Sequence, residues 1–242
     1  RREVAPFLNL GLFALALLAV DRTVAAYPLE RVGDALHRIP LGALTGALLG
    51  VALGYLALVA QDVVAFRIVG CRVTLREALV PSFVAAAVSA SAPGSMITGG
   101  GARYRLYRGA GLTAPEATAV TMVVAGTWVL GLLALAGSLF LTRPLPAYLA
   151  SRMPGATGRL TGAALLALVA AYLLLAAVRS GRPPRPGRFA ARIPTLRLAL
   201  AQIGASLGDW LCASATLYVL LSSVERVSFP DLLAAFCVRS EE

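Results

Sequence analysis

Long apolar runs separated by short polar connections dominate the chain. These runs cover residues 4–20, 41–66, 116–141, 160–178 and 198–221. An α-helix rises about 1.5 Å per residue, so about 20 apolar residues cross the roughly 30 Å hydrocarbon core of a bilayer. The pattern therefore predicts an all-α, polytopic helical membrane protein with about five full transmembrane helices.

The segment between the second and third long runs has a different pattern. Its apolar part, residues 78–92, is short for a membrane span and is interrupted by Pro81, which we expect to break the helix. Such a segment is typical of a helix that enters the membrane, stops and returns to the same side. We therefore expect one re-entrant helical hairpin over about residues 77–111, with its second helix starting near Ala102. The expected helix break consists of Pro93, Gly94, Gly99, Gly100 and Gly101.

The arginines between the runs give an independent test of this hairpin. Cytoplasmic loops of membrane proteins carry an excess of basic residues. If residues 78–92 crossed the membrane fully, the basic connections at 67–76 and 179–197 would lie on opposite faces. If the segment returns instead, both connections lie on one face, which then carries about twice as many arginines as the other. The charge distribution favours the hairpin.

Composition narrows the class of partner. The chain is 58% hydrophobic and 14% charged, has a net charge of +10, and its 22 basic residues are all arginine. In a soluble protein this charge would suggest nucleic acid. Here the arginines flank apolar runs, so we expect anionic lipid head groups as partners and no bound nucleic acid. Three dispersed cysteines and the single histidine, His37, predict no metal site, and we expect no cofactor.

Small residues and helix-start signals indicate how the helices pack. Four glycines spaced by four residues lie on one stripe of the second run, which lets another helix approach closely; they are Gly42, Gly46, Gly50 and Gly54. Thr113 and Glu116 have the spacing of a capping box before the third long run. These features alone would also fit a membrane assembly module that transports nothing.

Two acids inside the predicted spans are candidate functional residues. Asp62 lies near the end of the second run, and Asp209 lies near the middle of the last. An acid inside a membrane segment is costly and usually faces the protein interior or water. A simpler interpretation places Asp62 at the membrane interface, capped by Arg67 or Arg72.

Arginines interleaved with tyrosines follow the expected helix break; they are Arg103, Tyr104, Arg105, Tyr107 and Arg108. Arginine grips a phosphate with two parallel hydrogen bonds, so we expect the three arginines to bind a lipid phosphate. We expect the two tyrosines, three residues apart, to lie at head-group level. The two acids could receive the ammonium groups of an aminoacyl lipid. The simpler alternative is that the arginines only anchor the topology and the tyrosines form an aromatic belt.

The stretch TLREALVPSFVAAAVSASAPGSMITGGGARYRLYRGAGLTAPE, residues 74–116, resembles the first re-entrant region of the lysylphosphatidylglycerol synthase/flippase family, the multiple peptide resistance factors. Two further segments are similar to that family, GYLALVAQDVVAFRIVG at residues 54–70 and GDWLCA at residues 208–213. The resemblance covers most of the chain. The central motif is fairly specific, whereas the flanking spans are generic.

The resemblance implies a transmembrane domain of the bacterial cytoplasmic (inner) membrane. Such a domain moves aminoacylated phosphatidylglycerol, for example lysylphosphatidylglycerol, to the outer leaflet, which gives resistance to cationic antimicrobial peptides. Full members add further spans and a C-terminal synthase domain in the same chain, a phosphatidylglycerol lysyltransferase. An alternative is therefore that the chain is the membrane part of such an aminoacyltransferase, because it shows no catalytic constellation of its own.

The chain ends early by comparison with that family. A possible second re-entrant segment begins at about residues 228–242 and is cut short. We therefore expect residues 1–242 to form a single transmembrane domain that is a fragment of a longer chain. A homo-oligomer is compatible with the glycine stripe.

Overall fold

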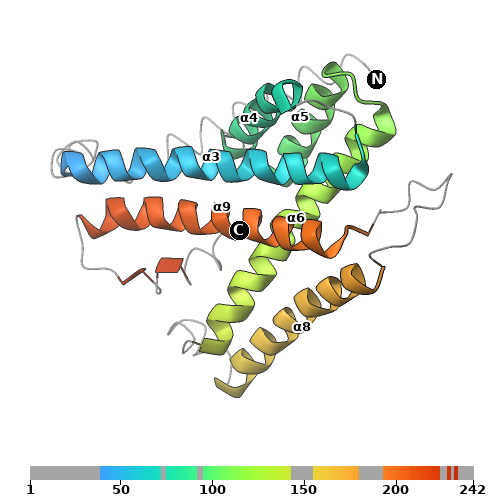
Figure 1. Ribbon diagram of the computed structural model, residues 1–242. Helices are drawn as coiled ribbons and strands as arrows, with labels where there is room; N and C mark the ends of the chain where they lie inside the picture. Colours follow the sequence, from blue (N-terminus) through green and yellow to red (C-terminus); the bar gives the residue numbers. More distant parts are fainter. Residues whose placement is uncertain are drawn as a thin grey trace, which may run out of the picture.

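The structure, a computed structural model, describes residues 39–71, 75–91, 95–142, 155–179 and 193–223, with short pieces at 228–229 and 232–233. These segments are helical and contain no strand. The helices, labelled as in Figure 1, are α3 (Leu41–Val69), α4 (Leu75–Ser91), α5 (Ser95–Gly109), α6 (Ala114–Thr142), α8 (Gly155–Arg179) and α9 (Leu196–Ser222). The all-α fold class is confirmed.

Four of these helices are long and apolar enough to cross a membrane: α3, α6, α8 and α9. The longest have 29 residues, or about 43 Å of helix, which exceeds the roughly 30 Å of hydrocarbon to be crossed. They match the four predicted spans from residue 41 onward within a few residues. The first predicted span, residues 4–20, lies outside the described residues.

Helices α3 and α9 lie side by side and antiparallel (Figure 1). Three glycines of the predicted stripe face α9: a Cβ atom on Gly46 would lie 3.3 Å from Val219, and one on Gly54 would lie 3.7 Å from Cys212. A Cβ on Gly50 would collide with the Thr216 hydroxyl. The predicted packing stripe is therefore confirmed at these positions. Gly42 has no neighbour within 4 Å of such an atom among the described residues.

Helix α6 crosses α9 obliquely and packs along α8 (Figure 1). Both contacts are made at glycines. A Cβ on Gly131 would lie 2.5 Å from Ser206 Cβ of α9, and one on Gly137 would lie 3.1 Å from the Gly162 carbonyl of α8. Close approach of backbones at small residues is the usual way in which helices associate in a membrane.

Helices α4 and α5 pack against each other as a hairpin, and the hairpin packs against α3 and α6. Two ring contacts fix its direction. Phe83, in the middle of α4, meets Tyr55 of α3 with ring centroids 5.0 Å apart, whereas Tyr107, near the end of α5, meets Phe66 at 5.2 Å. The hairpin therefore leaves from the carboxyl end of α3 and returns to that end, where α6 begins. This is the geometry expected of a re-entrant pair.

Two details of the predicted break are wrong. Helix α4 continues through Pro81, and Gly99, Gly100 and Gly101 lie inside α5, which begins at Ser95 rather than near Ala102. Glycine inside a helix costs about 1 kcal/mol relative to alanine, a penalty that tertiary packing can offset. A Cβ on Gly100 would lie 3.6 Å from Thr121 of α6. Pro93 and Gly94 fall between the two helices, outside the described residues.

The start of α6 follows the predicted capping box. The backbone N–H of Thr113 donates to the Glu116 carboxylate at 2.9 Å, and the Thr113 hydroxyl donates to it at 2.6 Å. The turn before it passes through Gly111, whose φ of 95° lies in the left-handed region that favours glycine. The proposed second re-entrant segment, 228–242, lies almost entirely outside the described residues.

Candidate functional site

A buried ion pair joins the hairpin to the spanning helix α3. Arg103 Nε of α5 lies 3.2 Å from Asp62 Oδ1 of α3, and the side chains are 10% and 0% exposed. Removing two charges from water is expensive, and the cost is repaid only when the partners are close and well oriented. The site therefore begins with a contact between two elements that the sequence places 41 residues apart.

Two hydroxyl groups complete the surroundings of Asp62. Ser82 of α4 and Tyr107 of α5 are both fully buried and interact with the carboxylate, although without normal hydrogen-bond geometry. Among the described residues, no hydrogen-bond partner reaches Asp62 Oδ2, Ser82 Oγ or Tyr107 OH. Three helices thus direct polar atoms with unused hydrogen-bonding capacity to one point inside an apolar bundle.

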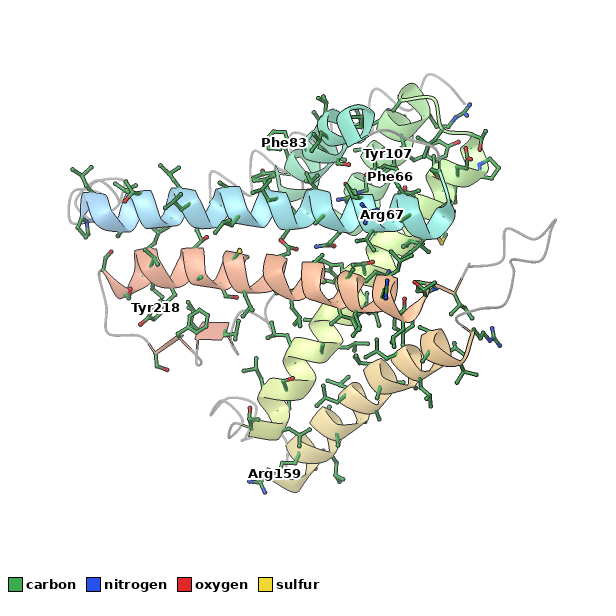
Figure 2. The ribbon with its side chains drawn as sticks, viewed as in Figure 1. Phe66, Arg67, Phe83, Tyr107, Arg159 and Tyr218 are labelled. Atoms are coloured by element: carbon green, nitrogen blue, oxygen red, sulfur yellow. The ribbon has the colours of Figure 1, made fainter. Side chains whose placement is uncertain are left out.

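The two tyrosines of the motif occupy different environments. Tyr107 is 0% exposed and packs edge-on against Phe66, whereas Tyr104 is 37% exposed; Figure 2 shows Tyr107 and Phe66 together where the hairpin meets α3. Arg103 and Tyr107 are four residues apart and so share the helix face that is turned toward α3. Tyr107 therefore has no exposed surface with which to contact a lipid head group, whereas contact of Tyr104 with a head group stays a prediction.

The three arginines are also separated. Arg103 is buried, whereas Arg105 and Arg108 are exposed at the returning end of the hairpin. Arg108 Nη1 donates to the Leu112 carbonyl at 2.9 Å and so closes the turn into α6. The single three-arginine cluster expected from the sequence is not formed, and binding of a lipid phosphate stays a prediction for each arginine.

The simpler interpretation of Asp62 is wrong in the pairing with Arg67. Asp62 is not at an exposed interface, and its ion-pair partner is Arg103 rather than Arg67, which is exposed. Arg72, the other suggested partner, lies outside the described residues.

Asp209 is linked to this site through Gln61, a residue that the sequence analysis did not single out. Gln61 is 1% exposed, and its Nε2 donates to Asp209 Oδ2 at 3.4 Å. Gln61 Oε1 has no hydrogen-bond partner among the described residues. The sequence signal for Gln61 was that it stands next to Asp62 inside a long apolar run. Neighbouring positions on a helix point in different directions, so two adjacent polar residues indicate polar partners on two sides.

A second polar group lies between α6, α8 and α9. Gln202 Nε2 donates to Thr127 Oγ1 at 2.7 Å, and the Tyr172 hydroxyl donates to Gln202 Oε1. These hydrogen bonds occupy both ends of the Gln202 amide, so the group fixes the three helices relative to one another. Single polar residues on three separate apolar runs gave no sign of this arrangement.

The chemistry available at the site is electrostatic. Across the described segments, no three histidine, cysteine, aspartate or glutamate side chains come close enough to hold a metal ion together. The described interior instead offers one cation, two acids and several neutral hydrogen-bonding groups. Such a set can bind charged groups and exchange partners as the hairpin moves.

Comparison with known proteins gives one informative match. No protein-family model matches the chain. The uncharacterized protein slr0712 of Synechocystis sp. is 30% identical over 239 residues, which covers 97% of this chain and 73% of slr0712. The chain belongs to the slr0712 family. The similarity to slr0712 extends over nearly the whole chain.

Proposed function

We propose that this membrane protein is a phospholipid translocase of the bacterial cytoplasmic membrane. Its proposed substrate is aminoacylated phosphatidylglycerol, such as lysylphosphatidylglycerol, which it carries from the inner to the outer leaflet. The added positive charge on the outer surface would weaken the binding of cationic antimicrobial peptides. The motif at residues 74–116, which resembles the lysylphosphatidylglycerol synthase/flippase family, supports this choice of substrate.

The observation that carries the proposal is the buried pair Asp62–Arg103 between a spanning helix and a hairpin. Charged side chains within membrane segments are rare and usually belong to a pathway for ions or polar groups. A bundle that only anchors or assembles could fill the same space with apolar side chains at no loss of stability. A costly pair that joins a short hairpin to the bundle therefore favours a transport role.

Charged groups follow one another from the membrane surface toward its centre. Arg105 and Arg108 are exposed at the returning end of α5. Asp62 lies seven residues inside the end of α3, or about 10 Å along the helix. Asp209 lies at the middle of α9 and is joined to Gln61, the residue next to Asp62, at 3.4 Å. A polar head group entering at the exposed arginines would then meet the two acids together.

The charges match the proposed substrate. A lysylphosphatidylglycerol head group has one phosphate and two ammonium groups, so it needs both a cation and acids along its path. Arginine suits the phosphate, because its fork of N–H groups fits two phosphate oxygens. The carboxylates of Asp62 and Asp209 suit the ammonium groups.

The test is lipid translocation by the purified protein in liposomes. Fluorescent lysylphosphatidylglycerol is placed in the inner leaflet, and its appearance in the outer leaflet is followed by quenching with a reagent that does not cross the membrane. We expect the wild-type protein to speed this movement well above protein-free liposomes, and Arg103→Gln and Asp62→Asn to abolish the gain. Arg67→Gln is the matched control, since Arg67 is an exposed arginine at the end of the same helix as Asp62.

Two results would contradict the proposal. The first is a wild-type rate equal to that of protein-free liposomes. The second is equal acceleration of phosphatidylcholine, which would indicate a scramblase without selection for the aminoacyl head group. Unchanged translocation by folded Arg103→Gln would show that the buried pair has only a structural role.

A further inference from the structure

The charged side chains away from the helix ends do not balance; among them, Asp62 and Arg103 are buried and Asp209 is half-buried. In the described segments, three charged side chains lie away from exposed helix ends: Asp62, Arg103 and Asp209. The remaining described charges lie near the ends of helices; they are Arg67, Arg105, Arg108, Glu116, Arg159, Arg179 and Arg197. If both acids were ionised, the described interior would carry one negative charge in excess.

The excess charge would lie at the least favourable depth. Asp209 is the central residue of α9, 13 residues from Leu196 and 13 from Ser222. An ionised carboxylate at the centre of a membrane costs at least about 2.5–3.5 kcal/mol on insertion scales. A single bound cation would remove this cost.

Geometry assigns the bound cation to Asp209 rather than to Asp62. Asp62 already has the guanidinium of Arg103 at 3.2 Å. Asp209 has the neutral amide of Gln61 at 3.4 Å, and Arg103 acts on it electrostatically from a greater distance. Within the described segments, the acid that lacks a close counter-charge is therefore the one at the centre of α9.

The Gln61 amide can form a hydrogen bond with both the ionised and the protonated carboxyl group of Asp209. Its Nε2 donates to the carboxylate in this structure, and its buried Oε1 has no hydrogen-bond partner among the described residues. Rotating the amide by half a turn exchanges the nitrogen and the oxygen, so that a protonated Asp209 would donate its O–H to Oε1. The orphaned oxygen is thus the acceptor that a proton on Asp209 requires.

A proton fits the site better than a metal cation does. Hard cations such as calcium and magnesium take about six oxygen ligands, whereas a proton needs one carboxylate oxygen and one acceptor. The hydrogen bond of Asp209 joins its carboxylate to the Gln61 amide, whose Oε1 supplies the one acceptor that a proton needs.

We infer that Asp209, with Gln61 as its partner, is a proton-binding site in the centre of the bundle. It holds one exchangeable proton when the Asp62–Arg103 pair is closed. If the proposed lipid translocation is correct, this site couples transport to the proton gradient, and that coupling rests on the proposed function. The proton site itself does not depend on it.

The neighbours of Asp209 limit which other groups could titrate there. Helix α3 contributes Asp62 beside Gln61, and α5 contributes Arg103 together with Tyr107, which contacts Asp62. One turn along α9 lies Cys212. Helix α6 has no titratable side chain after Glu116, and α8 contributes Tyr172, which binds Gln202 instead.

The test is infrared spectroscopy of the purified protein, which shows a protonated carboxyl group as a separate C=O stretching band that shifts in D₂O. As the pH is lowered into the mildly acidic range we expect one such band in the wild-type protein and its loss in Asp209→Asn. In Arg103→Gln the band should roughly double, because Asp62 loses its counter-charge and also takes up a proton. The matched control is Glu116→Gln, which removes a half-buried carboxylate at the start of α6 and should leave the band unchanged.

Each outcome is decisive. Absence of the band from the wild-type protein at mildly acidic pH, or its persistence in Asp209→Asn, overturns the assignment, and so does a spectral change that requires sodium rather than acid. The wild-type titration needs no variant, so it stays valid if a variant fails to fold. A band that behaves as expected in a protein that moves no lipid would support the proton site and contradict the proposed function, whereas lipid movement without the band would do the reverse.

Discussion

One added methyl group at Gly131 should loosen the crossing of α6 over α9. A Cβ at this position would lie 2.5 Å from Ser206 Cβ and 3.2 Å from the Ser206 carbonyl carbon, and it would also collide with the Ser206 hydroxyl. Rotation of the side chain can move the hydroxyl, but it cannot move the Cβ or the backbone carbon. Gly131→Ala therefore forces the helices themselves to separate.

The magnitude follows from contact distances. Carbon atoms attract best at about 3.5–4.0 Å, so contact restored from 2.5 Å requires a shift of about 1 Å or more. Overpacking of this kind costs about 1–3 kcal/mol. Replacing glycine by alanine within a helix raises the free energy of unfolding by up to about 1 kcal/mol, which offsets part of this cost. We expect a net loss of about 1–2 kcal/mol in the free energy of unfolding.

The matched control is Gly126→Ala on the same helix. A Cβ on Gly126 has no neighbour within 4 Å, so this substitution keeps only the gain in helix propensity. We expect the free energy of unfolding to be unchanged or to rise by up to about 1 kcal/mol.

Intrinsic fluorescence reports directly on this crossing. The chain has two tryptophans, and they lie on the two crossing helices: Trp128 of α6 and Trp210 of α9 stack with ring centroids 5.0 Å apart. Unfolding can be followed through their emission as sodium dodecyl sulfate is added to the protein in mixed micelles. Gly131→Ala should lower the unfolding midpoint and shift the emission of the folded state, because the stacked rings separate.

The double variant Gly131→Ala/Ser206→Gly adds a methyl group on α6 and removes the side chain of α9 with which this group would collide. It should recover part of the lost stability, since the Ser206 Cβ and hydroxyl contacts are removed while the 3.2 Å backbone contact stays. Equal stability of Gly131→Ala and Gly126→Ala, with unchanged tryptophan emission, would refute the reasoning.

Three further predictions concern other contacts. Arg103→Gln should destabilise the protein by about 3–5 kcal/mol because it leaves Asp62 buried without its counter-charge; Asp62→Asn/Arg103→Gln should recover most of this loss in the same detergent titration, and additive losses would contradict the pairing. Gly50→Leu should separate α3 from α9, whereas Gly42→Leu, which meets no neighbour within 4 Å, should not; disulfide cross-linking of engineered cysteine pairs between α3 and α9 would distinguish them. Thr113→Ala should cost about 0.5–2 kcal/mol by removing the hydroxyl that donates to Glu116 at the start of α6, seen as faster hydrogen exchange in the first turn of α6, and unchanged exchange would argue against a role of this hydroxyl.

The helices were predictable because the bilayer restricts how a chain can cross it. Backbone groups of an isolated span in hydrocarbon must form hydrogen bonds within their own segment. An apolar run of about 20 residues is therefore expected to form a helix. The runs at residues 41–66 and 198–221 therefore gave α3 and α9 to within a few residues. The glycine stripe showed which face of α3 would pack, but not against which helix.

The break in the hairpin was harder to place. Glycine disfavours a helix and proline interrupts its hydrogen bonds, so local preference argued against helix at Pro81 and at Gly99–Gly101. Both sites are helical in the structure. The costs involved are a few kcal/mol, and packing of α4 and α5 against each other and against α3 and α6 can exceed them.

The candidate site was only half visible in the sequence. Asp62, Asp209 and Arg103 stand out because ionisable groups are rare in apolar segments. Their partners do not stand out, because nothing in the sequence separates Gln61 and Ser82 from other polar residues or shows which face of α5 is turned toward α3. A lipid-exposed arginine and a buried one also look alike in a motif in which charged and aromatic residues alternate.

The sequence by itself determined that the chain is a helical membrane protein with a short hairpin, since hydrophobic length and charge placement act locally. Only the tertiary structure decided that Arg103 turns inward to Asp62 while Arg105 and Arg108 face outward. The reason is helical rotation: each residue turns by about 100°, so the position of the hairpin against α3 selects which arginine is buried. The motif that looked like one cationic cluster is thus divided between a surface and an interior, and among the described residues the acid at the centre of α9 has a neutral amide rather than a cation as its close partner.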